Sequence, residues 1–152
     1  IPRGKVLKEV EMAEEYLTAD VVVNMPVAKN HSAAMTSIAM KNWMGIIKDR
    51  GWWHKNNLHQ CIADFCTVTR AEWTIVDATR VMVEKGPQGP GALIHPNLVV
   101  MSRDQVAADT YISVAIFEDR LEMDAVKYLV HAREMNLGCT YVDKMKIHKV
   151  EA

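Results

Sequence analysis

"VVVNMPVA", residues 21–28, opens the stretch of sequence that decides the fold. A β-branched run of this kind is typical of a strand buried on both faces, and Pro26 weakens the strand or marks its end. The continuation "KNHSAAMTSIAMKNWMG", residues 29–45, places two lysines, a histidine and two asparagines among small and apolar residues. Apolar residues at three- and four-residue steps predict a helix from Met35 to Ile47.

Strand-like and helical patterns alternate along the rest of the chain. Asn57 with Gln60, and Ser102 with Gln105, resemble capping boxes that begin helices. We expect strands at 6–12, 72–84, 98–102 and 144–151, helical segments at 13–19, 58–69, 106–117 and 123–138, and loops at 48–56 and 85–97. This order predicts an α/β fold, with a layered, mostly parallel or mixed sheet flanked by helices.

Length and charge restrict the class of protein. The chain has 152 residues and a net charge of −1, so we expect a single domain, 1–152, that binds neither nucleic acid nor a membrane. No apolar run approaches the ~20 residues of a membrane span. The chain begins with Ile1, which suggests an excerpt of a longer protein. We expect a cytoplasmic location, with a targeting signal on missing N-terminal sequence as the alternative.

Three cysteines, Cys61, Cys66 and Cys139, have no regular spacing. Their odd number argues against a disulfide framework, and Cys61 and Cys66 are too far apart in sequence for a C-x-x-C motif. We expect buried free thiols in a reducing compartment.

Polar residues follow the expected strands at their carboxyl ends, where α/β sheets bind ligands. Lys29 and His31 follow the strand at 21–28, Asp77 follows the apolar stretch "WTIV" at 73–76, and Arg103 and Asp104 follow the strand at 98–102. We expect them to meet at one edge of the sheet, where Asp77, Arg103 and Asp104 bind substrate. The alternatives are structural: Asp104 or Ser102 caps a helix, Asp77 holds a turn, Lys29 is solvated and His31 is a core histidine.

Lys41 and Asn42 interrupt an otherwise apolar surface of the expected helix. Because an unpaired buried lysine costs several kcal/mol, Lys41 needs an anionic partner or a chemical role. A desolvated lysine is a common nucleophile or base. We therefore assign Lys29, His31, Lys41 and Asn42 as the catalytic group, with His31 as general acid or base.

His54 and His59 are candidate metal ligands. Histidines five apart do not share a helix face, but His54 lies in an expected loop and His59 in the first turn of a helix. Nickel, zinc or iron would suit imidazole ligands, and the alternative is solvated loop histidines. "GPQGPG" at 86–91 has neither phosphate-loop spacing nor enough N–H donors, so we expect a rigid turn at the mouth of the site.

The chain resembles the prokaryotic family called domain of unknown function 362. The matching stretches are "ADVVVNMPVAKNH", "TSIAMKNWMGIIKDR", "IADF", "TIVDA", "GPQGPG" and "SRDQVAADT". The resemblance implies an association with ferredoxin-type iron–sulfur modules. Because this chain lacks the cysteine motif, a cluster would belong to a missing segment or to a partner.

The chain is also distantly similar to the lactate racemase family. His31 followed by Lys41 repeats that family's His-x9-Lys spacing, although "TSIAM" replaces its glycine-rich stretch. The resemblance implies a lysine that carries a nickel-pincer cofactor, and histidines that ligate nickel and transfer a proton at a 2-hydroxy acid.

Two functions remain open from the sequence. The first is a metal- or lysine-dependent enzyme, an isomerase or oxidoreductase, that acts on a small anionic organic molecule. The second is a non-catalytic accessory module of an iron–sulfur redox protein, with a ferredoxin-type module as partner.

Overall fold

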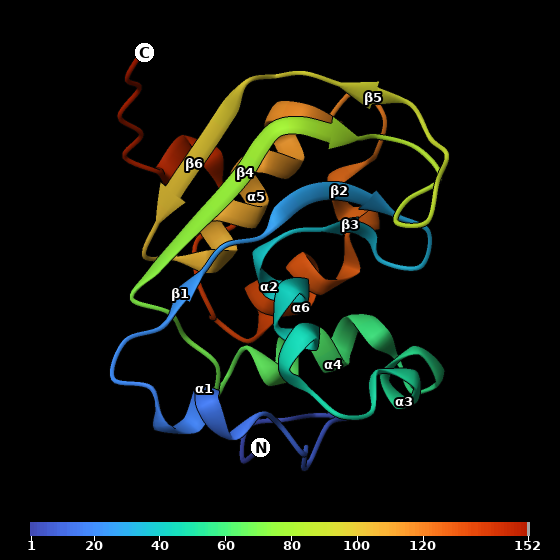
Figure 1. Cartoon of the computed structure of the whole chain (residues 1–152), viewed down its shortest axis with the longest axis vertical. Coiled ribbons are helices and arrows are strands. Elements are labelled where there is room, and N and C mark those ends of the chain that lie inside the picture. The colour runs from blue at the N-terminus through green and yellow to red at the C-terminus, as the bar shows by residue number, and fades with distance from the viewer. Residues whose placement is uncertain (152) are drawn as a thin grey trace.

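The fold is a mixed sheet packed on helices, seen in a computed structural model that describes residues 1–151 (Figure 1). The strands are β1 (Val23–Asn24), β2 (Val27–His31), β3 (Met35–Ser37), β4 (Trp73–Met82), β5 (Leu93–Ile94) and β6 (Leu98–Ser102). The α-helices are α1 (Glu14–Thr18), α2 (Ala39–Asn42), α3 (Arg50–Lys55), α4 (Leu58–Phe65), α5 (Gln105–Phe117) and α6 (Lys127–Glu134). Short 3-10 turns are η1 (Trp43–Ile46), η2 (Met123–Ala125) and η3 (Val142–Lys144).

Strand β4 is the centre of the sheet, because β1, β2, β5 and β6 all pair with it. Strands β1 and β2 run parallel to β4, whereas β5 and β6 run antiparallel to it. Strand β3 pairs antiparallel with β2 at the edge. The α/β fold class with a mixed sheet is therefore confirmed.

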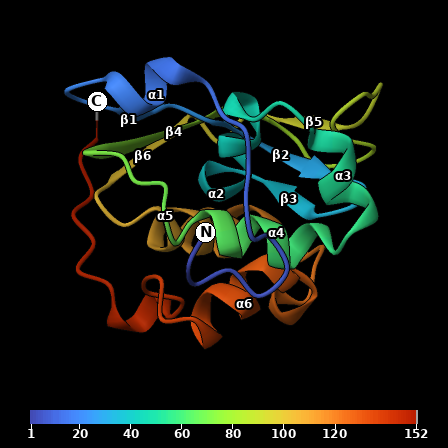
Figure 2. The same cartoon turned by 90° about the horizontal axis from the view of Figure 1, so that it is seen from below.

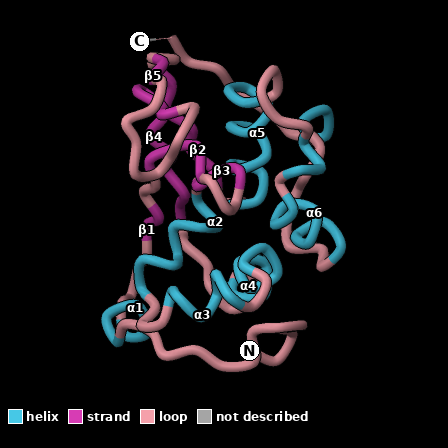
Figure 3. Tube along the Cα trace, turned by 90° about the vertical axis from the view of Figure 1, so that its right-hand side faces the viewer, coloured by secondary structure: helices cyan, strands magenta, loops and turns pink. Residues whose placement is uncertain are grey.

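The sheet and the helices form two layers. In Figure 3 the strands lie on one side, and α5 and α6 lie together on the other; Figure 2 shows the same arrangement from below. The inward-facing side chains of β4, Thr74, Val76 and Ala78, are buried. Their alternation with more exposed neighbours is the period-2 pattern of a strand with one covered face.

The opposite face of the sheet exposes several apolar side chains. Val23 of β1, Val27 of β2, and Val99 and Met101 of β6 each expose more than two-fifths of their surface. In the part of the chain that the structure describes, no helix is long and apolar enough to cross a membrane.

Local structure differs from the sequence prediction around the first strand. Met25 and Pro26 divide the expected continuous strand into β1 and β2. The expected helix from Met35 begins as β3 and becomes helical only at Ala39, because residues 35–37 pair with β2. Tertiary pairing thus outweighs the apolar periodicity of this short segment.

Four further predictions are wrong. Residues 6–12 form no strand, and pair only through a bridge from Met12 to Ile47. The expected loop at 48–56 contains α3, in which Trp53 is buried. Asp104, rather than Ser102, caps α5 by accepting from Val106 N and Ala107 N. Residues 144–151 are not a strand.

Candidate functional site

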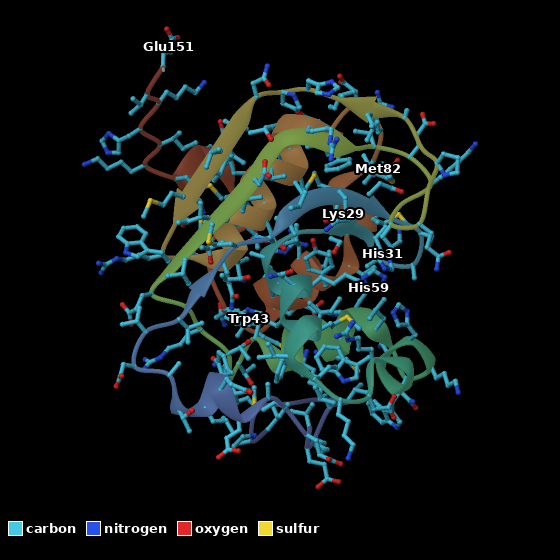
Figure 4. The ribbon with its side chains drawn as sticks, viewed as in Figure 1. Lys29, His31, Trp43, His59, Met82 and Glu151 are labelled. Carbon is cyan, nitrogen blue, oxygen red and sulfur yellow. The ribbon has the colours of Figure 1, made fainter. Side chains whose placement is uncertain are left out.

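The candidate site lies where β2 ends and the chain turns into β3. Figure 4 shows Lys29 and His31 from β2 and His59 from α4 in the same part of the molecule, near Met82 at the end of β4. The "GPQGPG" loop is fastened beside them, because Gly86 N donates to Asn30 Oδ1 at 3.0 Å and Ser32 N donates to Gly86 O at 3.0 Å. A Cβ on Gly86 would lie 2.0 Å from Asn30 O, so this contact requires glycine.

The ring of His31 is held by backbone donors. Its Nδ1 accepts from Ala33 N at 3.1 Å and from Ala34 N at 3.2 Å, which close the turn after β2. Because Nδ1 accepts two N–H groups, the neutral ring carries its proton on Nε2. Burial, followed by the charge of Lys41, lowers the pKa of His31 to about 4. His31 is therefore a neutral imidazole with one N–H donor left for a ligand.

Lys41 is the buried cation of the site. Only 9% of its surface is exposed, and in residues 1–151 its ammonium makes no hydrogen bond or ion pair. Among the described residues, the buried side-chain nitrogens and oxygens that have no hydrogen-bond partner are His59 Nδ1, Thr110 Oγ1 and Ser113 Oγ. Lys41 Nζ also has no partner but is not one of these buried atoms, so it reaches solvent. Burial, then the charges of Lys29 and Arg50, lowers the pKa of Lys41 to about 8.

Further cations and imidazoles surround these two residues. The imidazole of His54 stacks on that of His31, with 5.9 Å between ring centroids. Burial, then the charge of Lys41, lowers the pKa of His54. Lys29 is half-buried, its Nζ donates to Val27 O at 2.7 Å, and burial lowers its pKa. Within residues 1–151, no carboxylate acts on the pKa values of these four groups, so they give this region a positive potential.

His59 joins the site to a buried polar network. Its ring stacks on Tyr128 at 6.3 Å, and Tyr128 Oη lies 2.7 Å from Thr36 Oγ1. Asp109 is fully buried beside Tyr128 and accepts from Ala39 N at 2.7 Å and from Met40 N at 3.2 Å. Burial raises the pKa of Asp109 to about 7, although these hydrogen bonds oppose the shift.

The Asp109 network positions the helix that carries Lys41. Helix α2 has only four residues, too few to be stable alone. Asp109 satisfies the N–H groups of its first turn, and Asn24 Nδ2 donates to Ala39 O at 3.0 Å. Asn42 is exposed and donates from Nδ2 to Asn24 Oδ1 at 2.8 Å. The predicted catalytic residue Asn42 therefore holds α2 in place through Asn24.

The three predicted substrate-binding residues do not reach this site. Asp77 is exposed in the middle of β4, opposite Val27 and Val99, where its Oδ1 accepts from Thr79 N and Thr79 Oγ1. The expectation of a common edge is wrong for Arg103 and Asp104, because β6 is antiparallel to β4. Ser102 pairs with Thr74 near the start of β4, so the residues after it lie at the opposite end from His31.

Arg103 and Asp104 have other contacts at that end. The guanidinium of Arg103 lies 4.7 Å from the ring centroid of Trp73. Asp104 caps α5, and its Oδ2 also accepts from Cys139 N at 2.8 Å. The structural alternative for Asp104 is therefore the one seen.

Two residues that act on Lys41 or on its helix were not identified from the sequence, namely Arg50 and Asp109. Arg50 lies in the segment expected to be a loop, and its charge lowers the pKa of Lys41. Asp109 lies within an apolar helix, where a lone acidic residue is a signal that could have identified it.

His31 and the buried thiols are poor metal ligands in this structure. Within residues 1–151, no three His, Cys, Asp or Glu side chains are grouped to hold one. His31 cannot offer Nε2 to a metal as a neutral ligand while its Nδ1 accepts two backbone protons. Burial raises the pKa of Cys61 to about 11 and that of Cys66 still higher, whereas metal ligation requires a thiolate. The metal assignment of His54 and His59 stays a prediction.

Comparison with known proteins supplies the family. A protein from Synechocystis sp. named "thylakoid-associated protein sll1697" is 25% identical over 135 residues, which cover 84% of this chain and 40% of that protein. The chain thus spans less than half of that relative's length. No solved structure matches the chain. The family model described as "domain of unknown function (DUF362)" matches residues 1–113, so the chain belongs to the DUF362 family.

Proposed function

We propose that the cluster of Lys29, His31, Lys41, Arg50 and His54 binds a small anionic organic molecule, on which Lys41 acts as nucleophile or base. The observation that supports this most is the lack of any carboxylate partner for Lys41 within residues 1–151, although Lys41 is 9% exposed. Burial of the rest of the side chain disfavours the charged ammonium, and an anionic ligand at Nζ would offset this cost.

Each group has a role in this proposal. Lys29 and Arg50 attract the anionic group of the ligand. The N–H of neutral His31 donates to an uncharged oxygen, a role that fits its two backbone donors better than the general acid or base expected from the sequence. Lys41 supplies the reactive amine, because at a pH near its pKa of about 8 a substantial fraction of the molecules carry a neutral Lys41.

Titration with oxalate, lactate and pyruvate, measured by calorimetry, tests the binding step. We expect saturable binding of at least one of them, weakened by salt and weakened about tenfold or more by Lys41→Met, since a charge-assisted hydrogen bond contributes ~1.5–3 kcal/mol. Lys48→Met is the matched control, because Lys48 is exposed and pairs with Glu11 at 2.6 Å. Equal affinity in the Lys41 and Lys48 variants would contradict the proposal.

The same titration distinguishes the accessory-module function. That function is favoured by the exposed apolar face of the sheet at Val23, Val27, Val99 and Met101. A module that only docks on an iron–sulfur partner needs no small-molecule site, so none of the three anions would bind in a saturable way. The resemblance to lactate racemases also stays a prediction, and Lys41 is the lysine that would carry the cofactor under it.

A further inference from the structure

We infer that Lys41 forms a Schiff base with a 2-oxo acid, a small molecule whose ketone or aldehyde carbon adjoins a carboxylate. This inference rests on the proposed function, and it specifies both the substrate class and the covalent step at the same site.

The surroundings of Lys41 favour its neutral, nucleophilic form. The side chain is buried, its Nζ reaches solvent, and its charged neighbours Lys29 and Arg50 are both cationic. Among the described residues no carboxylate holds a proton on Nζ. At pH 7.5, the neutral fraction of an amine with a pKa of about 8 is roughly 200-fold larger than that of an amine with the ordinary pKa of 10.5.

Lys29 and Lys41 differ in the hydrogen bonding of their amines, and this difference favours Lys41 as the nucleophile. Lys29 Nζ donates to Val27 O at 2.7 Å, and this acceptor favours the protonated amine. Burial lowers the pKa of Lys29 as well, but its Nζ is already engaged by a backbone acceptor, whereas within residues 1–151 Lys41 Nζ has none.

His31 supplies the group that a carbonyl oxygen requires. Because Nδ1 accepts from Ala33 N and Ala34 N, the ring offers only the N–H at Nε2. A neutral imidazole polarises a carbonyl oxygen by hydrogen bonding. It does not protonate the Lys41 amine, which therefore stays nucleophilic. A carboxylate near Lys29 and a carbonyl near His31 and Lys41 together describe a 2-oxo acid.

The covalent step is balanced without an external oxidant or reductant. The lone pair of Lys41 Nζ attacks the carbonyl carbon, and the carbonyl oxygen takes up a proton as Nζ loses one, which gives a carbinolamine. Loss of the hydroxyl group with a proton releases one water molecule and leaves the C=N bond. A proton from solvent then binds the imine nitrogen, and the protonated imine withdraws electrons from the adjoining carbon atoms.

Reductive trapping tests this inference on the whole chain. The protein is incubated with pyruvate or glyoxylate and sodium cyanoborohydride, and the reduced adducts are located by peptide mass spectrometry. We expect Lys41 to be labelled at least about tenfold faster than Lys48, an internal control whose pairing with Glu11 raises its pKa. The rate of labelling should rise with pH, with a midpoint of about 8.

Lys41→Arg separates this inference from the proposed function. Arginine keeps the positive charge but is no nucleophile at this pH, so pyruvate should still bind while the adduct disappears. If wild-type protein binds pyruvate but Lys41 is labelled no faster than Lys48, the Schiff base is excluded and the anion site stands. If neither pyruvate, lactate nor oxalate binds and Lys41 is not labelled, both proposals are wrong.

Discussion

At the scale of single residues, His31 has a structural role, and in our proposal it also has a chemical one. Its Nδ1 closes the turn after β2 by accepting from two backbone N–H groups, and this leaves Nε2–H for a ligand. The two alternatives that the sequence left open, a core histidine and a site histidine, are thus compatible in one ring, because its two nitrogens serve different partners.

Replacement of His31 separates these roles. His31→Ala leaves two backbone donors unpaired and should lower the free energy of unfolding by ~1–3 kcal/mol. His31→Asn should cost less, because the Asn Oδ1 can accept from the same N–H groups. Urea unfolding at pH 7.5 measures both, and equal losses would contradict the role of Nδ1.

The pH dependence of His31→Asn follows from the lowered pKa of His31. The pKa is about 4 in the folded chain and about 6.5 when unfolded, so the unfolded chain binds more protons between these values. The contribution to stability is present above about pH 6.5 and is lost as the pH falls towards 4. The wild type should therefore lose stability relative to His31→Asn between pH 7.5 and 4.5.

At the scale of elements, short segments are held in place by their neighbours. The loop of residues 85–92 packs its Gly86 against β2, where a Cβ would lie 2.0 Å from Asn30 O. Gly86→Ala should push this loop away from β2, lower the free energy of unfolding by ~1–3 kcal/mol and weaken anion binding. Thermal unfolding and calorimetry would measure the two effects.

Gly45→Ala is the control for the loop. Gly45 has an open surrounding, with no atom within 4 Å of an added Cβ, so stability and anion affinity should not decrease. A Gly86→Ala variant as stable as Gly45→Ala would show that the loop does not pack on β2 as described.

At the scale of the whole molecule, Asp64 joins the N-terminal segment to α4. Buried Asp64 Oδ2 accepts from Val6 N at 2.7 Å and from Leu7 N at 2.9 Å. Burial alone would raise the pKa of Asp64, but hydrogen bonds from the backbone of residues 5–7 and from the Gln60 side chain outweigh burial and lower it. Asp64→Ala should cost ~2–3 kcal/mol and speed the hydrogen exchange of residues 5–12. Asp20→Ala, at an exposed position, should change neither.

The outcome for Asp64→Ala also tests how the core is divided. Leu7 belongs to the larger apolar cluster with Trp53, Phe65 and Tyr128. Release of residues 5–12 should therefore also reduce the stability of α4. Fast exchange of residues 5–12 already in the wild type would contradict the anchoring role of Asp64.

Local sequence patterns determined most of the elements and the centre of the site. Alternation and helical periodicity predicted β4, β6, α5 and α6, and the Asn57 cap begins α4 as expected. His31, Lys41 and His54 lie within 24 positions of one another in the sequence, so a few tight turns bring them together. Periodicity and capping depend on residues that are close in sequence, so the elements they produce can be predicted from the sequence alone.

Only the tertiary structure decided which distant residues meet. The antiparallel direction of β6 separates Arg103 and Asp104 from the site, and pairing with β2 turns residues 35–37 into a strand. The cap that Asp109 places on α2 joins positions 70 residues apart. Contacts across the whole fold determine the direction of the strands, the buried hydrogen bonds and the desolvation of Lys41. The periodicity of one segment carries no information about these contacts.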